Sequence, residues 1–549
     1  MGSFDFRSLT RAALTCVRPF LTAAGACALA ACAKTGTFPE RSGGLIVAIA
    51  QEPVSLNPLY LEGALGYAIG ELGYSYLTNY DSHGAIVADV AAVVPTLGNG
   101  GISADGKRVT YHLRHDAVWQ DGVPLSSRDV AFTYRAIMNP ANSVSSRYGY
   151  DRVASVDVPD PYTAVVRLKR SYAPIVSSFF GGDSNYPILP AHLLAGYPNL
   201  NHVPYNAAPI GSGPYRLARW TRGDRLDVIA NEKYYAGRPA ISRLSLHFVH
   251  DSSTIADQLA TGEVDAAFFA DVSQIAALRR IPKHRIVVTP VPYFYALPFN
   301  VTDPLTKDVA IRRAFAFAID RRALVRKVTH GLYDSESGMR GLFTWAFDPR
   351  AGSVPYDPRR AQAVLRNAGW NAGPDGIRTK DGRRLTLQLA FFTGSDIANE
   401  FVPLIVEQER AVGIDVTTKR YSREEFTALD GPLMQGRFQV ALYAYQSTVD
   451  PDASWLLACG QRGPHGFNDA RYCNPAVDRA LAHAASVLNR NARRRDYRFV
   501  QRRLLADMPY EFLCQVSEID VIPQRLRGYD RPLLSPYASV ARWRYAWSR

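Results

Sequence analysis

Strand-like and helix-like segments alternate almost to the end of this 549-residue chain, and this alternation limits the possible folds more than any other feature. Residues 45–50 and 244–249 have the pattern of strands, and residues 127–138 have the pattern of a helix that begins at Ser126 or Ser127. Further helices are expected over residues 307–330, with Gly331 as the C-cap, and over 358–368, 397–411, 476–488 and 492–508. No fixed repeat, low-complexity block or long Pro/Gly-rich linker separates these segments. We therefore expect an α/β protein whose two or more domains pack together or interleave.

The N-terminus differs from the rest of the chain. Arg7, Arg11 and Arg18 precede residues 20–31, which carry no charge and are almost all small or apolar. The apolar run is about a dozen residues long, which is too short to span a bilayer. Residues 1–31 are therefore predicted to be a secretory signal peptide.

The apolar run ends at residues 29–32 in Leu-Ala-Ala-Cys, which resembles the lipobox of bacterial lipoproteins. In a lipobox the small residues fit the signal peptidase, and the cysteine thiol becomes acylated. We expect Cys32 to be the lipidated N-terminus of the mature protein, with residues 32–44 as a tether to the periplasmic or cell-surface side of a membrane. The alternatives are an ordinary secretory signal, or a short anchor helix with an accidental cysteine.

The chain is basic, with a formal net charge of +13 at pH 7. Removal of residues 1–31 takes away three Arg and Asp5 and so lowers the charge by 2 to +11. The Lys and Arg residues are scattered and form no long basic arm, so we expect no nucleic-acid partner. Attraction to an anionic membrane surface is the favoured interpretation.

Three cysteines remain after the predicted signal peptide and Cys32 are set aside. Cys459 and Cys473 can close a small loop rich in Gly, Pro, Asn and Asp, which a disulfide would restrain in an oxidising compartment. Cys514 lies in an apolar run and is expected to be a buried thiol.

Catalytic motifs are missing from the sequence. It has no Gly-x-Ser-x-Gly elbow, no His-Glu-x-x-His and no Cys-x-x-Cys. Residues 101–107 match Gly-x-x-x-x-Gly-Lys, but Arg108 replaces the Ser or Thr that would hold magnesium, and a strand follows in place of a helix. We expect a protein that is not an enzyme, with no catalytic residues, no cofactor and no metal site.

Several segments, taken in order, resemble the extracellular solute-binding proteins of family 5, which serve dipeptide, oligopeptide and nickel ABC importers. Residues 119–124 read Trp-Gln-Asp-Gly-Val-Pro, and residues 209–215 read Pro-Ile-Gly-Ser-Gly-Pro-Tyr, close to the family's Gly-Thr-Gly-Pro-Tyr turn. The other matching segments are 111–114, 125–130, 231–239, 262–265, 311–321, 356–358 and 368–370. Together they extend the resemblance over roughly residues 45 to 545.

The resemblance implies a two-lobed periplasmic-binding-protein fold of type II, with three domains and a ligand cleft between the lobes. The first lobe would contain a discontinuous core domain and one additional domain, and the second lobe would be continuous. The expected boundaries are 45–78, 207–291 and 517–549 for the core domain, 79–206 for the additional domain, and 292–516 for the second lobe. The resemblance also strengthens the prediction of a Cys459–Cys473 bridge.

The family's ligand region implies a site around residues 443–452. In peptide-binding relatives an aspartate three residues before the Asp-Pro pair receives the α-amino group of the peptide. Ser447 stands there in this chain, and a serine lacks the charge that an ammonium prefers, unless Asp450 substitutes for it. Aromatic side chains supply flat apolar walls with a polar tip, which suits a ligand cleft, although core packing is the commoner role. The predicted ligand-binding residues are Tyr293, Tyr295, Asn300, Trp345, Tyr443, Tyr445, Gln446, Ser447 and Asp450.

The resemblance implies the substrate-binding component of an ABC importer. Such a protein captures a peptide or peptide-like small solute outside the cytoplasmic membrane and delivers it to a permease in that membrane. We expect it to act as a lipid-anchored monomer. The alternatives are a sugar, an opine or a metal chelate as ligand, a sensory or signal-peptide receptor without transport, and an exported hydrolase.

Overall fold

The computed structural model describes residues 44–61, 63–335, 338–463 and 466–546. The predicted signal peptide, Cys32 and almost all of the tether lie outside the described residues. Within the described part of the chain, no helix is long and apolar enough to cross a membrane.

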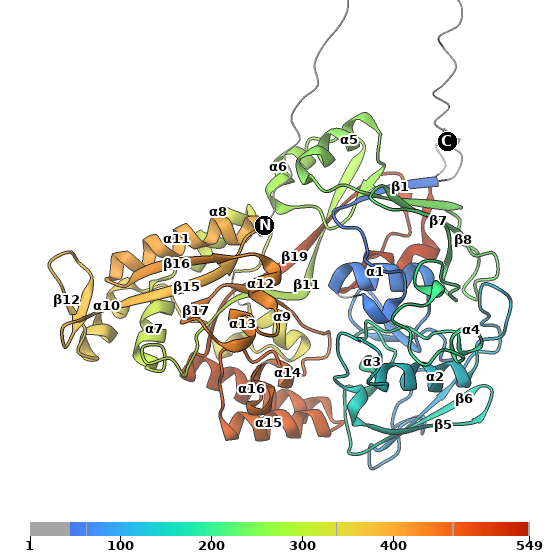
Figure 1. Ribbon diagram of the computed structural model, residues 1–549, viewed down its shortest axis with the longest axis horizontal. Coiled ribbons are helices and arrows are strands. Elements are labelled where there is room, and N and C mark those ends of the chain that lie inside the picture. The colour runs from blue at the N-terminus through green and yellow to red at the C-terminus, as the bar shows by residue number, and fades with distance from the viewer. Residues whose placement is uncertain (1–43, 62, 336–337, 464–465, 547–549) are drawn as a thin grey trace, which may run out of the picture. The chain divides into compact units, whose positions relative to one another are not determined.

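An eight-stranded sheet joins distant parts of the chain (Figure 1), in the order β18-β11-β19-β10-β1-β9-β8-β7. Its strands are β1 (Gly44–Ile49), β7 (Tyr215–Thr221), β8 (Arg225–Ala230), β9 (Arg243–Phe248), β10 (Ala266–Ala267), β11 (His284–Pro298), β18 (Tyr443–Gln446) and β19 (Tyr510–Pro523). Strand β1 runs parallel to its neighbours β9 and β10, and the other pairs are antiparallel. The strands predicted over 45–50 and 244–249 are both present.

Smaller sheets and sixteen α-helices make up the rest of the described structure, so the prediction of an α/β protein is confirmed. The remaining strands are β2 (Thr78–Tyr80), β3 (Ile86–Ala88), β4 (Arg108–His112), β5 (Val153–Asp160), β6 (Thr163–Leu168), β12 (Asn371–Ala372), β13 (Arg378–Lys380), β14 (Arg383–Arg384), β15 (Thr386–Phe392), β16 (Asp415–Tyr421), β17 (Val440–Ala441), β20 (Leu526–Arg527) and β21 (Arg544–Tyr545). The helices are α1 (Gly63–Gly73), α2 (Ser127–Met138), α3 (Ile175–Ser178), α4 (Ala191–Leu194), α5 (Ile255–Thr261), α6 (Ile275–Leu278), α7 (Val309–Ala318), α8 (Arg321–Thr329), α9 (Met339–Phe343), α10 (Pro358–Asn367), α11 (Asp396–Val412), α12 (Arg423–Thr427), α13 (Pro432–Gln435), α14 (Ser454–Leu457), α15 (Pro475–Ser486) and α16 (Arg490–Asp507).

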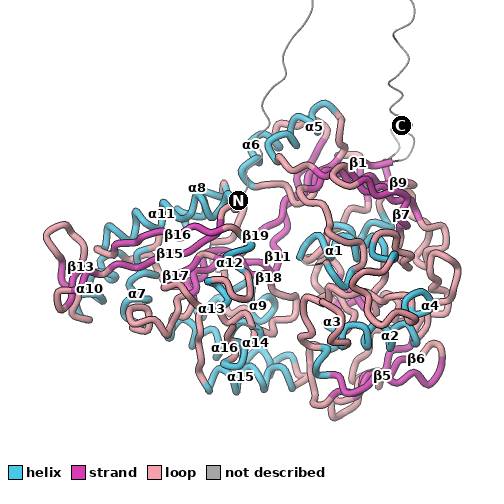
Figure 2. The backbone as a smooth tube through the Cα atoms, in the orientation of Figure 1, coloured by secondary structure: helices cyan, strands magenta, loops and turns pink. Residues whose placement is uncertain are grey.

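The long strands β11 and β19 lie side by side and connect the two ends of the large sheet (Figure 2). Their register shifts between Pro290 and Phe294, where three residues of β11 oppose a single residue of β19, and it shifts again between Tyr295 and Ala296. Pro290 and Pro292 fall in this bulge, and proline has no N–H to donate to a ladder. The ladder between β11 and β19 is therefore weakened over residues 290–296, where the bulge and the second shift follow each other.

Separate apolar cores lie on the two sides of this bulge. One core contains Trp543 with β1, β8 and β9, and another surrounds Trp119 in the segment that includes β4, β6 and α2. Beyond the bulge, the cores around Phe315 and Phe294 are built from residues 294–343 and later segments. Each side of the bulge thus has the buried apolar surface that a folded unit needs.

The family-like turns have structural roles. Ser126 caps α2, and the Asp129 carboxylate accepts a hydrogen bond from the backbone N–H of Ser126 at 2.8 Å, which completes a capping box. A Cβ atom on Gly211 would overlap the carbonyl oxygen of Gly73, so only glycine fits where this turn meets the end of α1. These contacts give the segments around Ser126 and Gly211 a role in helix capping and packing.

The prediction of one helix over residues 307–330 is wrong. The segment contains two helices, α7 and α8, because Asp320 accepts a hydrogen bond from the backbone N–H of Ala323 and so starts a new helix. The predicted cap at Gly331 is also displaced by one residue, since His330 takes the left-handed conformation at φ 50°.

A buried carboxyl group lies inside the core beyond the bulge. Glu409 of α11 has no exposed surface, and neither of its carboxyl oxygens has a hydrogen-bond partner among the described residues. Burial raises the pKa of Glu409 well above its ordinary value of 4.5, and the nearby Glu511 carboxylate adds to that rise.

We predict that Glu409→Gln makes stability less dependent on pH. The folded protein holds the Glu409 proton more tightly than the unfolded chain, so the contribution of Glu409 to stability falls as the pH rises above 4.5, by up to about 1.4 kcal/mol for each pH unit. Glutamine cannot ionise, so E409Q should gain stability relative to the unchanged protein at pH 8 and gain less at pH 5. Urea unfolding at both pH values measures this, with the exposed Glu407→Gln on the same helix as control. An equal effect of E409Q at both pH values would contradict the prediction.

Candidate functional site

Strand β18 forms one edge of the eight-stranded sheet and pairs with β11 (Figure 2). One residue beyond β18, the Ser447 N–H donates to the carbonyl oxygen of Pro292 at 2.6 Å. This bond fixes which residues of β18 face β11. Alternate residues of an antiparallel strand direct both backbone groups to the same neighbour. Tyr443 and Tyr445 therefore direct their backbone groups at β11, while Ala444 and Gln446 direct theirs at the open edge.

Three of the predicted site residues share one face of this strand pair. Gln446 lies opposite Tyr293, and Ala444 lies opposite Tyr295, so these four side chains are on the same side of the sheet. Gln446 is exposed, and both tyrosines are half-buried. Burial raises the pKa of Tyr293 to about 12, and the Arg423 guanidinium acts in the opposite direction. This face offers flat aromatic surface beside backbone groups that pair with no other strand in the described part of the chain.

Tyr445 lies on the opposite face, so the structure does not group it with Tyr293 and Tyr295. It is 2% exposed, stacks on Phe294 with ring centroids 5.5 Å apart, and donates a hydrogen bond to Asp469 at 2.9 Å. Burial raises the pKa of Asp469 to about 8. Tyr445 is a core residue of this structure because the register of β18 turns it inward. Tyr443 shares that face and is half-buried against Phe392 and Phe426.

Asn300 and Trp345 occupy different surroundings from the tyrosines. The Asn300 side chain is 7% exposed and donates to the carbonyl oxygen of Gly436 at 2.7 Å, which is a structural contact. The half-buried Trp345 ring is surrounded by three guanidinium groups, those of Arg490, Arg493 and Arg494, at 4.3, 5.4 and 5.7 Å from its centroid. Trp345 therefore lies in a cationic environment.

The loop after β18 leaves no free acid at the expected position. Ser447 is 4% exposed, and its hydroxyl has no hydrogen-bond partner among the described residues. Both carboxylate oxygens of Asp450 accept hydrogen bonds from the Arg493 guanidinium, at 2.8 and 2.5 Å. Burial raises the pKa of Asp450, and Arg493 opposes that rise. Asp450 is thus already neutralised within the protein, which disfavours it as a substitute for the missing aspartate.

Sequence reasoning missed a set of residues from the 79–206 segment that meets this loop. The Asp183 carboxylate accepts hydrogen bonds from the N–H groups of Val449 and Asp450, at 2.6 and 3.1 Å. Asp452 accepts hydrogen bonds from the hydroxyls of Tyr148 and Tyr172, at 2.8 and 3.2 Å. Burial and the Asp450 charge raise the pKa of Asp183 to about 7. No local pattern marks these residues, because their partners lie more than 250 positions away.

The structure contains the expected disulfide between Cys459 and Cys473. It joins the segment after α14 to the residue that precedes the N-cap of α15, Asn474. Cys514 is a buried free thiol, as expected.

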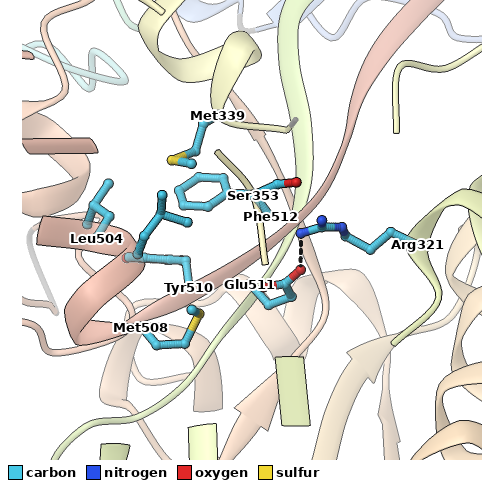
Figure 3. A pocket seen from close by; sticks show the side chains of 9 residues that line it. Arg321, Met339, Ser353, Leu504, Met508, Tyr510, Glu511 and Phe512 are labelled. Carbon is cyan, nitrogen blue, oxygen red and sulfur yellow. Dashed lines mark hydrogen bonds and ion pairs between the residues drawn. The ribbon is translucent and has the colours of Figure 1, made fainter. Parts of the chain in front are cut away.

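A small pocket lies elsewhere, beside β19, and Figure 3 shows the side chains around it. Its lining is mostly apolar, with Met339, Met508 and Phe512, and the Arg321 guanidinium donates to the Glu511 carboxylate at 2.6 Å on one side. None of the predicted ligand-binding residues lines it. The pocket is therefore separate from the predicted ligand-binding residues of the β18 edge.

A sequence profile described as "Bacterial extracellular solute-binding proteins, family 5 Middle" matches residues 92–464. The chain belongs to this family. It is 30% identical over 526 residues to Protein XP55 of Streptomyces lividans, covering 93% of this chain and 92% of that protein. It is 25% identical over 519 residues to the oligopeptide-binding protein AppA of Bacillus subtilis, covering 93% of each.

Solved structures agree with this assignment. NikZ from Campylobacter jejuni, in complex with Ni(L-His), has a TM-score of 0.78 and 25% identity, covering 91% of this chain and 99% of NikZ. AppA from Bacillus subtilis, in complex with a nonapeptide, has a TM-score of 0.76 and 23% identity, covering 92% of this chain and 99% of AppA. The chain therefore has the two-lobed type II fold of periplasmic binding proteins, and it is the substrate-binding component of an ABC importer.

We predict that loss of the disulfide lowers the free energy of unfolding by about 3 kcal/mol. The reason is that the disulfide closes a loop of about 15 residues, and the unfolded chain gains conformational entropy when this loop is open. Denaturant unfolding with and without dithiothreitol measures this effect. A Cys459→Ser/Cys473→Ser variant should match the reduced protein and should not respond to dithiothreitol. A reduced protein as stable as the oxidised one would contradict the prediction.

Proposed function

We propose that this protein captures an extended, peptide-like solute along the open edge of β18. The observation that carries the proposal is the outward direction of the Ala444 and Gln446 backbone groups, next to the half-buried faces of Tyr293 and Tyr295. An extended peptide adds to such an edge by main-chain hydrogen bonds, and side-chain pockets then set specificity. The nonapeptide held by AppA supports a peptide-like solute, whereas the Ni(L-His) held by NikZ is a metal chelate and supports the second candidate below.

The proposed ligand lacks a free ammonium group at the Ser447 end of the strand. The aspartate that would receive an ammonium is replaced by Ser447, and Asp450 is paired with Arg493. An ammonium placed there would lose its water without gaining a charged partner, which is unfavourable. A peptide with a blocked amino terminus, or a solute without an amino group, fits these residues better.

An anionic solute such as an opine or a metal chelate is the second candidate. The Arg490 guanidinium stacks on Trp345, and among the described residues it takes part in no ion pair or hydrogen bond. Burial lowers the pKa of Arg490, and the like charges of Arg494 and Arg493 lower it further. A carboxylate near Arg490 would relieve this crowding of positive charge.

We also propose the division into lobes. The discontinuous core domain would comprise 45–78, 207–291 and 517–549, with 79–206 as an additional domain and 292–516 as the second lobe. The bulge at Pro290–Phe294, which falls at the proposed boundary, supports a hinge there. The ligand would lie between the lobes, in the manner of a non-enzymatic binding protein.

The proposed setting is outside the cytoplasmic membrane. Cleavage before Cys32 and acylation of its thiol would anchor the monomer to a membrane, where it meets its permease. The family assignment to extracellular solute-binding proteins supports export.

We predict that Gln446→Pro weakens peptide binding at least about tenfold while leaving the ligand-free melting temperature nearly unchanged. Proline removes the outward N–H at this position but none of the inward bonds between β18 and β11, and edge strands tolerate proline. Isothermal titration of the mature domain with acetylated peptides measures the affinity. Gln446→Ala is the matched control, because it keeps the N–H and should bind nearly as well as the unchanged protein. Equal affinity for Q446P and Q446A would contradict edge pairing.

We predict that acetylated short peptides raise the melting temperature more than the same peptides with free amino termini. A ligand that binds only the folded state must stabilise it, so a thermal-shift screen reports binding directly. The screen should include opines, sugars and metal chelates. A stronger shift with free amino termini would show that another acid receives the ammonium, and a shift with chelates or opines alone would favour the second candidate.

A further inference from the structure

The loop over residues 447–452 lies between the proposed ligand strand β18 and the contact with Asp183. It continues directly from β18, so its conformation follows that of the proposed ligand strand. It is also the part of the proposed second lobe that the Asp183 carboxylate contacts, through the N–H groups of Val449 and Asp450. Ligand strand and lobe contact are therefore only a few residues apart.

Asp183 is held in place on its own side. The Tyr80 hydroxyl donates to the Asp183 carboxylate at 2.8 Å, and the Tyr67 hydroxyl donates to the Asp183 carbonyl oxygen at 3.0 Å. Asp183 is 8% exposed, so its oxygens are directed at the loop and at Tyr80 with little access to water. A carboxylate that accepts three hydrogen bonds in such a place is already oriented for its partner.

The loop brings apolar contact as well. The Val449 side chain is 4% exposed and packs in one cluster with Tyr67, Tyr80 and Leu534, all of which lie outside the 292–516 segment. Its carbonyl oxygen accepts a hydrogen bond from the Thr344 hydroxyl at 2.6 Å. The loop therefore has contacts with both proposed lobes. Separation of the lobes would expose the Val449 side chain and the N–H groups of Val449 and Asp450.

We propose that Asp183 is a positioning residue that couples occupation of the β18 edge to closure of the two lobes. This inference rests on the proposed function. When a solute pairs with Ala444 and Gln446, it stabilises β18 and the loop that follows in the conformation in which the Val449 and Asp450 N–H groups donate to Asp183. Asp183 touches no solute, yet it sets affinity because the closed form depends on it.

The test compares Asp183→Ala with Asp116→Ala in the mature domain. Asp116 lies in the same segment, and its carboxylate is 60% exposed in a pair with Arg114, so its loss should cost little. The probe is acetyl-pentaalanine amide, with titration calorimetry for affinity and small-angle X-ray scattering for the radius of gyration. Asp183→Asn keeps one acceptor oxygen and nearly the same shape, so it serves if D183A fails to fold.

We expect D183A to bind the probe at least about tenfold more weakly than D116A, with D183N between them, because two buried N–H groups lose their acceptor. We also expect the probe to compact D116A more than D183A, which a purely structural role of Asp183 would not produce. Equal affinity together with equal compaction would overturn the inference.

The two proposals fail in different ways. If the probe does not bind the unchanged protein, the peptide assignment is wrong. The role of Asp183 is then decided by the radii of gyration of D183A and D116A without solute. A larger radius of gyration for D183A than for D116A would support that role without a peptide ligand, and equal radii would overturn it.

Discussion

The pairing of β11 with β19 is the interaction on which the rest of the structure depends. These strands are the longest in the described chain, and they join β18 at one edge of the sheet to β1 and its neighbours. Their ladder is interrupted where Pro290 and Pro292 lack N–H groups. A strand pair that is regular on both sides of a short irregular stretch, here residues 290–296 of β11, can bend there while each side keeps its core, which is what a two-lobed binding protein requires.

The position of β18 follows from the same pairing. Because β11 has β19 on one side, β18 can pair only on the other side and becomes an edge. Natural proteins usually protect such edges, since open backbone groups invite pairing with another chain. An open edge beside half-buried tyrosines is therefore more easily explained as a binding surface than as a defect. The Asp450–Arg493 pair and the Asp183 contacts then hold the loop that follows the edge.

Much of the fold could be predicted from local sequence. Ser126 acts through Asp129, three residues further on, and Trp119 through a tight turn that ends at Val123, so the local sequence pattern predicts these features. Gly211 differs, because its reason lies in the distant Gly73. The break at Asp320 could not be predicted as readily, because its capping role competes with a helical pattern that continues on both sides. Tyr445 was expected in the cleft, but its direction depends on strand register, and a shift of one residue would have exchanged it with Gln446. Asp183 could not be found at all, since its partners are set only by the folded chain.

The central claim is that the solute pairs with the outward backbone groups of β18. Hydrogen exchange at single-residue resolution, with and without a bound solute, tests it most directly. The account predicts that the solute slows exchange at the Ala444 and Gln446 amides and leaves the Tyr445 amide, which already bonds to β11, almost unchanged. Uniform protection across residues 443–446, or protection confined to other parts of the chain, would contradict it.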